Sequence, residues 1–220
     1  IWKTTNANLA NTNGSPTWPQ LTECESSQAI SSMAFDPLDP TYRTIWASFA
    51  HFSSLGSDSS PINGLLKTIN GGISWMHLAE STLTGMEVQT VLPTAVTDPV
   101  THQQIVLVAI PPPGITSTNG ILRSVDGGRT FAPAPVIGSL GAGTDLAQDP
   151  TTPQRIYAAL PGQDVYQSND AGATWINTNL PGAASTARIM LAVHYNSSTG
   201  TFALYAANIT MNALNGFSMT

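Results

Sequence analysis

The sequence contains a single cysteine among its 220 residues, Cys24. An internal disulfide and a cysteine-based metal site are therefore both excluded. The four histidines (His51, His77, His102 and His194) are scattered without the spacing of metal ligands, so we expect no metal site. No glycine-rich stretch has the strand-to-helix setting of a phosphate-binding loop, and we expect no cofactor.

Charge is also scarce, at 9% of residues, and the seven basic residues against thirteen acidic ones leave a net charge of −6. Because no basic run could neutralise phosphates, we expect no nucleic-acid partner. No uninterrupted apolar run approaches the length of a membrane span. The Gly-x-Ser-x-Gly motif of serine hydrolases is absent as well, and no catalytic triad can be argued.

An eight-residue pattern recurs at 68–75, 124–131 and 168–175. It reads Ser or Thr, any residue, Asp or Asn, any residue, Gly, any residue, Ser or Thr, aromatic. Its defining residues are Thr68, Asn70, Gly72 and Trp75; Ser124, Asp126, Gly128 and Phe131; Ser168, Asp170, Gly172 and Trp175. Internal repeats of this kind indicate a repeat architecture.

Each position of the pattern has a local physical reason. A short Asp or Asn side chain accepts hydrogen bonds from nearby backbone N–H groups and closes a tight turn. The glycine permits the positive φ that such a turn requires. The terminal aromatic residue begins the next strand and can fill the space between neighbouring sheets. The pattern therefore predicts a structural turn rather than an active site.

The pattern resembles the Asp-box, or BNR repeat, of sialidases, xyloglucanase-like glycoside hydrolases, sortilin-type receptors and photosystem assembly factors. In those families the box joins the third and fourth strands of a β-propeller blade. The resemblance implies an all-β fold, a propeller of four-stranded antiparallel blades with about four blades visible. High Gly and Pro content agrees with many short strands separated by turns.

We expect one propeller region over 1–220, with repeat units at approximately 1–22 (partial), 27–78, 83–134, 138–178 and 184–220 (partial). The first unit begins with a box that Ala7 to Pro16 interrupt and that resumes at Thr17. Two arrangements are open. The two ends could close a small four-bladed ring, or the region could belong to a propeller of roughly six to eight blades. We favour the larger propeller, completed by further blades of the same chain or by a partner chain.

The resemblance also implies where catalytic residues would lie. Sialidases carry an Arg-Ile-Pro stretch, whereas Arg155 and Ile156 are followed here by Tyr157, so a sialidase is not expected. Xyloglucanase-like enzymes use two carboxylates across a cleft at the face away from the boxes. The candidates at matching positions are Glu80, Glu87, Asp145 and Asp58, each of which also reads as a solvated loop acid. Four others are interpreted as Asp-Pro turn residues: Asp36, Asp39, Asp98 and Asp149.

The remaining candidates are aromatic. Trp46, Phe49 and His51 end a strand and enter a polar loop, where a ring could stack on a sugar; packing between blades is the other interpretation of Trp46. The other tryptophans (Trp2, Trp18, Trp75 and Trp175) are expected in the core.

The sequence favours an extracellular or cell-surface module that binds a glycan or a protein through its loop face without catalysis. The alternatives are part of a xyloglucanase-like hydrolase that uses two carboxylates and, more weakly, an assembly scaffold.

Overall fold

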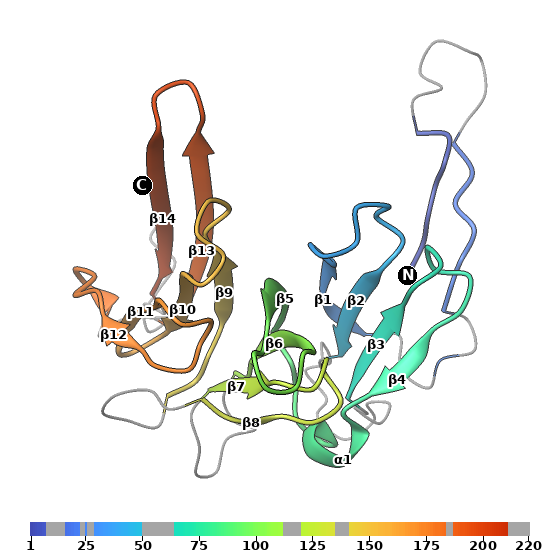
Figure 1. The fold of residues 1–220 in the computed structure, drawn as a ribbon, viewed down its shortest axis with the longest axis horizontal. Coiled ribbons are helices and arrows are strands. Elements are labelled where there is room, and N and C mark those ends of the chain that lie inside the picture. The colour runs from blue at the N-terminus through green and yellow to red at the C-terminus, as the bar shows by residue number, and fades with distance from the viewer. Residues whose placement is uncertain are drawn as a thin grey trace, which may run out of the picture.

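The computed structural model describes residues 1–7, 16–22, 25, 29–49, 64–111, 120–134, 141–183 and 187–210. These residues form three four-stranded antiparallel sheets and one two-stranded sheet, arranged side by side along an open arc (Figure 1). Each four-stranded sheet follows the chain order of its strands, as in a meander. The fold is therefore all-β and consists of successive blades of a partial propeller, as the sequence predicts.

The strand bounds repeat from blade to blade. The first blade holds β1 (Ile30–Phe35), β2 (Ile45–Phe49), β3 (Leu65–Thr68) and β4 (Met76–Leu78). The second holds β5 (Thr90–Thr97), β6 (Gln104–Ala109), β7 (Ile121–Ser124) and β8 (Ala132–Pro133). The third holds β9 (Asp145–Gln148), β10 (Ile156–Leu160), β11 (Asp164–Ser168) and β12 (Ile176–Asn177). The two-stranded sheet pairs β13 (Arg188–Asn196) with β14 (Thr201–Ile209).

One element was not expected from the sequence. A single helical turn, α1 (Glu80–Leu83), follows β4 and buries Leu83. Its position between β4 and β5 makes it part of the connection from the first blade to the second. The four sheets fall inside the expected repeat units, although the division of the chain into those units stays a prediction.

The hydrophobic core lies between blades rather than inside any one of them. Trp46 and Leu65 of the first blade pack with Val108 of the second. Leu107 of the second blade packs with Ile156 and Trp175 of the third. Because the second and third sheets bury both faces against their neighbours, their central strands β6 and β10 are almost wholly apolar.

Polar side chains link the first strands of neighbouring blades, β1, β5, β9 and β13. Ser32 Oγ on β1 accepts a hydrogen bond from the Val91 amide on β5 at 3.4 Å. Asp145 Oδ2 on β9 accepts one from the Leu191 amide on β13 at 2.8 Å. Edge groups that a lone sheet would leave unpaired are thus satisfied by the next blade.

Residues 1–6 lie antiparallel beside residues 17–21, outside the named strands, and these two segments are here called the N-terminal hairpin. An isolated bridge joins Trp2 to Gln20, and the Lys3 amide donates to the Pro19 carbonyl at 3.1 Å. Within the hairpin, Asn6 Oδ1 accepts the Thr17 amide at 3.0 Å, the bond that closes an interrupted box. The prediction that the box resumes at Thr17 is confirmed.

Candidate functional site

Chain order fixes two opposite faces of the blades. The boxes connect the third strand of each blade to the fourth, at one end of the sheets. Connections from second to third strands, and from one blade to the next, lie at the other end, here called the loop face. It includes α1 and residues 161–163. Candidate ligand-binding groups on the loop face are therefore separated from the box turns by the length of a blade.

The three boxes adopt the same hydrogen-bonded turn. In the second, the Gly128 amide donates to Ser124 Oγ at 2.9 Å, and Ser124 Oγ donates to Asp126 Oδ1 at 2.7 Å. Asp126 then accepts the Thr130 amide at 3.0 Å and the Thr130 hydroxyl at 2.6 Å. The first and third boxes repeat the bond from glycine amide to hydroxyl at 3.0 and 2.8 Å. The predicted turn is confirmed, and its polar groups are occupied by one another.

Box carboxylates are held in the charged state. Burial raises the pKa of Asp126, but hydrogen bonds from Thr130 and Ser124 outweigh it, and the pKa lies below its ordinary value. The pKa of Asp170 is lowered in the same way by Thr174 and Ser168. A carboxyl group that donates a proton near neutral pH needs a raised pKa. These two aspartates are therefore unsuited to act as general acids.

The Asp-Pro aspartates also serve turns. Asp98 accepts the amides of Val100 and Thr101, and Asp149 accepts the amide of Thr151 at 2.7 Å. Asp149 is completely buried and forms an ion pair with Arg155 at 3.1 Å. The predicted turn role of these residues is confirmed.

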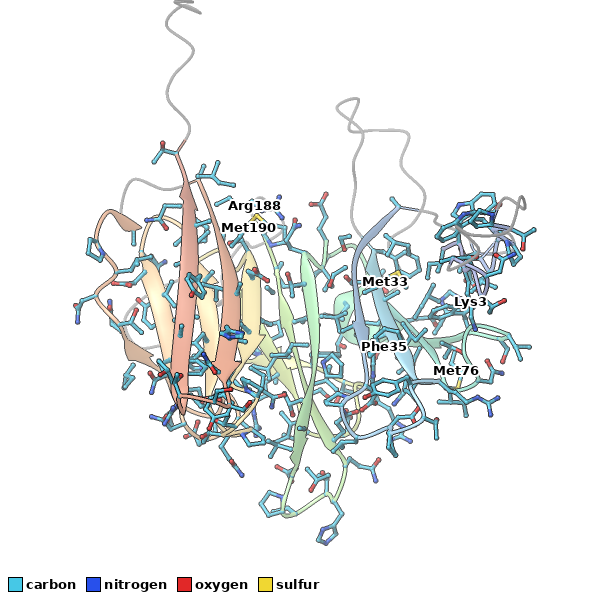
Figure 2. The ribbon with its side chains drawn as sticks, turned by 90° about the horizontal axis from the view of Figure 1, so that it is seen from above. Lys3, Met33, Phe35, Met76, Arg188 and Met190 are labelled. Atoms are coloured by element: carbon cyan, nitrogen blue, oxygen red, sulfur yellow. The ribbon has the colours of Figure 1, made fainter. Side chains whose placement is uncertain are left out.

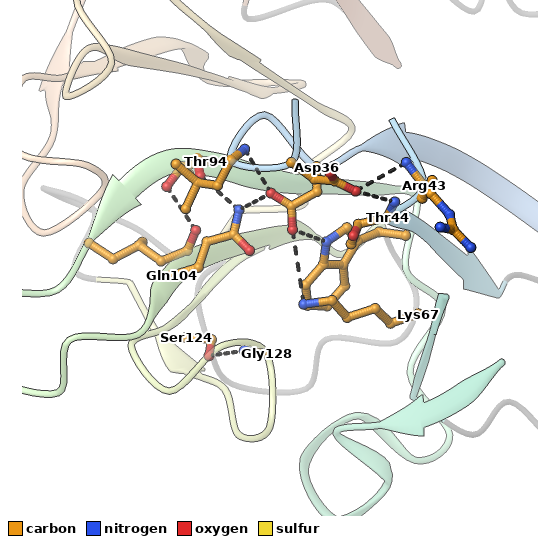
Figure 3. A network of polar contacts seen from close by, with 12 residues as sticks. Asp36, Arg43, Thr44, Lys67, Thr94, Gln104, Ser124 and Gly128 are labelled. Carbon is orange, nitrogen blue, oxygen red and sulfur yellow. Dashed lines mark hydrogen bonds and ion pairs between the residues drawn. The ribbon is translucent and has the colours of Figure 1, made fainter. Parts of the chain in front are cut away.

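Asp36 has a second role, at the junction of the first two blades (Figure 3). Its carboxylate accepts hydrogen bonds from Trp46 Nε1 at 3.1 Å and from Gln104 Nε2, on the second blade, at 2.8 Å. Lys67 Nζ lies 3.9 Å from the same carboxylate and 4.2 Å from the centre of the Trp46 ring. The network fixes the Trp46 ring between the blades.

The aromatic binding candidates lie in the core. Trp46 is 0% exposed and Phe49 is 1% exposed, so neither ring offers a face to a sugar. The interpretation of Trp46 and Phe49 as stacking residues is wrong, because β2 buries both side chains on opposite faces. Trp46 packs against the second blade, which is its other interpretation, and Phe49 packs with Leu66 and Trp75. His51 lies outside the described residues, as does Asp58.

Three catalytic candidates can be placed, and they lie in different settings. Asp145 sits on β9, where it accepts the amides of Leu146 and Leu191 and therefore joins blades. Glu80 is exposed on α1, 3.7 Å from His77, which also pairs with Glu25 at 2.7 Å. Glu87 is partly buried just before β5. Asp145 is thereby a structural residue, whereas Glu80 and Glu87 both belong to the connection from the first blade to the second, on the loop face.

Two tryptophans expected in the core are exposed instead. Trp2 is 60% exposed and Trp18 is 54% exposed. Both line a cavity of about 400 Å³ between the N-terminal hairpin and the first blade, together with Met33, Phe35 and Tyr42. Their places in the repeat match buried residues of the other blades, which is why the sequence predicted burial.

Among the described residues, no group of His, Cys, Asp and Glu side chains is placed to hold a metal ion. Within the same part of the chain, no helix has the length and apolar character needed to cross a membrane.

No protein-family model matches the sequence, and no curated protein matches it either. Solved structures do. The GH74 enzyme of Niastella koreensis superposes with a TM-score of 0.52 at 16% identity, over 86% of this chain and 31% of that one. An ancestral GH74 enzyme gives a TM-score of 0.50 at 13% identity, over 86% and 26%. The chain thus spans about a third or less of the length of these enzymes, and the likeness establishes the propeller fold alone.

Proposed function

We propose that this chain is a non-catalytic propeller module, extracellular or at the cell surface, that binds a glycan or a protein partner through its loop face. The proposal rests on the hydrogen bonds that the aspartate carboxylates accept, because these bonds are structural. Asp36, Asp98 and Asp149 hold turns, Asp126 and Asp170 close boxes, and Asp145 joins blades. These carboxylates stabilise the fold through their hydrogen bonds. The rigid fold in turn presents the loop face as a binding surface.

Loop composition favours an uncharged glycan as the ligand. The connections at 112–119 and 135–140 contain no charged residue, and 51–63 contain one, Asp58. Serine, threonine and asparagine side chains supply neutral donors and acceptors that match sugar hydroxyls. A strongly charged partner would find few countercharges in these three connections.

Affinity electrophoresis through gels containing neutral polysaccharides such as xyloglucan tests the proposal. We expect retardation of the chain without release of reducing ends. Replacing 112–119 by a Gly-Ser linker of equal length should weaken the retardation, whereas Val100→Ala, on the box face, should not. Unchanged mobility in every polysaccharide gel would overturn the glycan proposal, and a protein partner would then be sought by cross-linking.

A second candidate is part of a xyloglucanase-like hydrolase, and the pair Glu80 and Glu87 favours it. Glu80 begins α1 and Glu87 follows it on the loop face, the face on which such enzymes place their acid and base. An inverting pair needs two carboxylates roughly 6.5–9.5 Å apart across a sugar. Release of reducing ends from xyloglucan that Glu87→Gln or Glu80→Gln abolishes would establish this function in place of the first.

A further inference from the structure

The cavity between the N-terminal hairpin and the first blade lies at the box end of that blade, away from the loop face. Gly71 of the first box lines it, and so does Tyr42, which belongs to the connection from β1 to β2 at the same end. Its volume of about 400 Å³ is in the range of pockets that bind small ligands. A ligand held here is therefore separate from one held on the loop face.

Aromatic side chains dominate the lining of this cavity. They are Trp2, Trp18, Phe35, Tyr42 and Trp75. The first four are 54–70% exposed. Phe35 and Tyr42 meet edge to face with ring centroids 6.0 Å apart, a contact that orients both rings. Rings of this kind supply a large contact area at a low cost in conformational entropy. The cavity thus offers aromatic surface on which the apolar C–H face of a sugar ring can stack.

Lys3 is the one charged side chain among the described residues that line the cavity. Its Nζ donates a hydrogen bond to the Gly71 carbonyl at 2.9 Å. An ammonium group has three donors, so the described contacts leave two of them for a ligand. Figure 2 shows Lys3 at the same end of the molecule as Met33 and Phe35 of β1, which line the cavity with it. The ammonium disfavours the cations that aromatic rings otherwise attract, and it favours an anion.

Backbone groups beside the cavity are already paired with one another. The Gly71 amide donates to the Arg43 carbonyl at 2.8 Å, and the Lys3 amide donates to the Pro19 carbonyl at 3.1 Å. An extended peptide binds through main-chain hydrogen bonds and would find few main-chain partners here. An acidic sugar needs an aromatic surface for its ring and one cation for its carboxylate, and the lining supplies both.

We propose that this cavity binds an acidic sugar, a hexuronate unit of an oligosaccharide or polysaccharide. The apolar face of the pyranose ring stacks on the side chains of Trp2 and Trp18, and the carboxylate accepts hydrogen bonds from Lys3 Nζ. The site lies at the opposite end of the blade from the loop face. It is thus a second binding site, and it does not depend on what the loop face binds.

Calorimetric titration of the 220-residue chain with a trimer of galacturonic acid tests the proposal. The fully methyl-esterified trimer is the matched neutral ligand, because it keeps the rings and removes the charges. We expect the acid to bind about threefold to fivefold more tightly than the ester, the ratio that one exposed ion pair supplies. Added salt should bring the two affinities together. Tryptophan fluorescence should change with the same dissociation constant, because Trp2 and Trp18 line the site.

Two variants separate the charge from the aromatic surface. Lys3→Met should lower the affinity for the acid to that for the ester and leave the affinity for the ester unchanged. A variant that merely displaced the hairpin would weaken both. Trp18→Ala, at a half-exposed position that the fold can lose, should weaken both ligands about tenfold or more. Tyr195→Ala removes an exposed ring on β13 and is the matched control, which should bind as the wild type does.

Equal affinities of the wild type for the acid and the ester would overturn the proposal, and so would no binding of either trimer at millimolar concentration. Tighter binding of a short apolar peptide with a free C-terminal carboxylate would also overturn it, by assigning the cavity to a protein segment. The variant in which a Gly-Ser linker replaces 112–119 should bind the acidic trimer as the wild type does. Failure of the loop-face proposal and failure of this one are thereby told apart.

Discussion

At the scale of single residues, the box turns depend on one buried hydroxyl each. Ser124 is 1% exposed, and its Oγ takes the Gly128 amide while donating to Asp126. The group is donor and acceptor at once, so no apolar side chain replaces it. Threonine does, since Thr68 makes the same bonds in the first box.

Ser124→Ala should therefore destabilise the fold by about 1–3 kcal/mol, the cost of leaving a buried amide without an acceptor. Ser124→Thr is the matched control and should stay within about 0.5 kcal/mol of the wild type, as substitutions that keep their contacts do. Urea unfolding followed by tryptophan fluorescence measures both. Equal losses for the two variants would show that the hydroxyl bonds do not hold the turn.

Gly128 is constrained twice. Its φ is +81°, and a Cβ there would lie 2.7 Å from the Trp46 ring. Gly162 has a φ of +76° with open space around it. Gly162→Ala should cost about 1–2 kcal/mol from backbone strain alone. Gly128→Ala should cost about 1–3 kcal/mol more, because the core between two blades must also expand. Urea midpoints of the two variants separate strain from overpacking, and similar midpoints would contradict the close approach to Trp46.

At the scale of elements, Asp145 holds three blades in register. Its carboxylate takes the Leu191 amide of β13 and a hydrogen bond from the Thr90 hydroxyl of β5 at 3.3 Å. Asp145→Ala should loosen β13 and β14 from the third blade, with a loss of about 1–3 kcal/mol. Hydrogen exchange should show faster exchange at Leu191 than at Ile156. Equally faster amide exchange in all blades would contradict a local role of Asp145 between the third blade and β13.

The elements also show which parts of the fold and of the candidate site could be predicted from the sequence. The boxes and Asp-Pro turns were predictable because their chemistry is local, within a few residues of the chain. The burial of Phe49 and the blade-joining role of Asp145 were not, because both depend on segments distant in the sequence whose position no local pattern gives. Helix α1 was missed because four residues carry no periodicity. The exposure of Trp2 and Trp18 was not predictable either, because a repeat pattern does not show which neighbours a side chain packs against.

At the scale of the whole molecule, the lowered aspartate pKa values make stability depend on acid. Asp126, Asp149 and Asp170 have pKa values below the ordinary 3.8 in the folded chain. Protonation therefore favours the unfolded chain, and their contribution is complete above about pH 4 and lost as pH falls through the folded values. We expect the urea midpoint to be steady from pH 7 to 5 and to fall below about pH 4.

The pair Asp126→Asn and Asp170→Asn tests the origin of this fall. Asparagine closes the first box, where Asn70 accepts the Ser74 amide at 3.0 Å, so the fold should survive. The double variant should lose less stability between pH 5 and 3 than the wild type does. An unchanged pH profile would place the acid sensitivity in other carboxylates.

The interrupted box of the N-terminal hairpin has one more consequence. Asn6 and Thr17 close the same turn that other boxes close with partners four residues apart, although these two are eleven residues apart in the sequence. The bond needs only that its two partners meet, and the segment between them is free in length. A box is therefore a natural point of insertion. Foreign peptides or whole domains could be displayed there without disturbing the blades, which makes the chain a graftable scaffold.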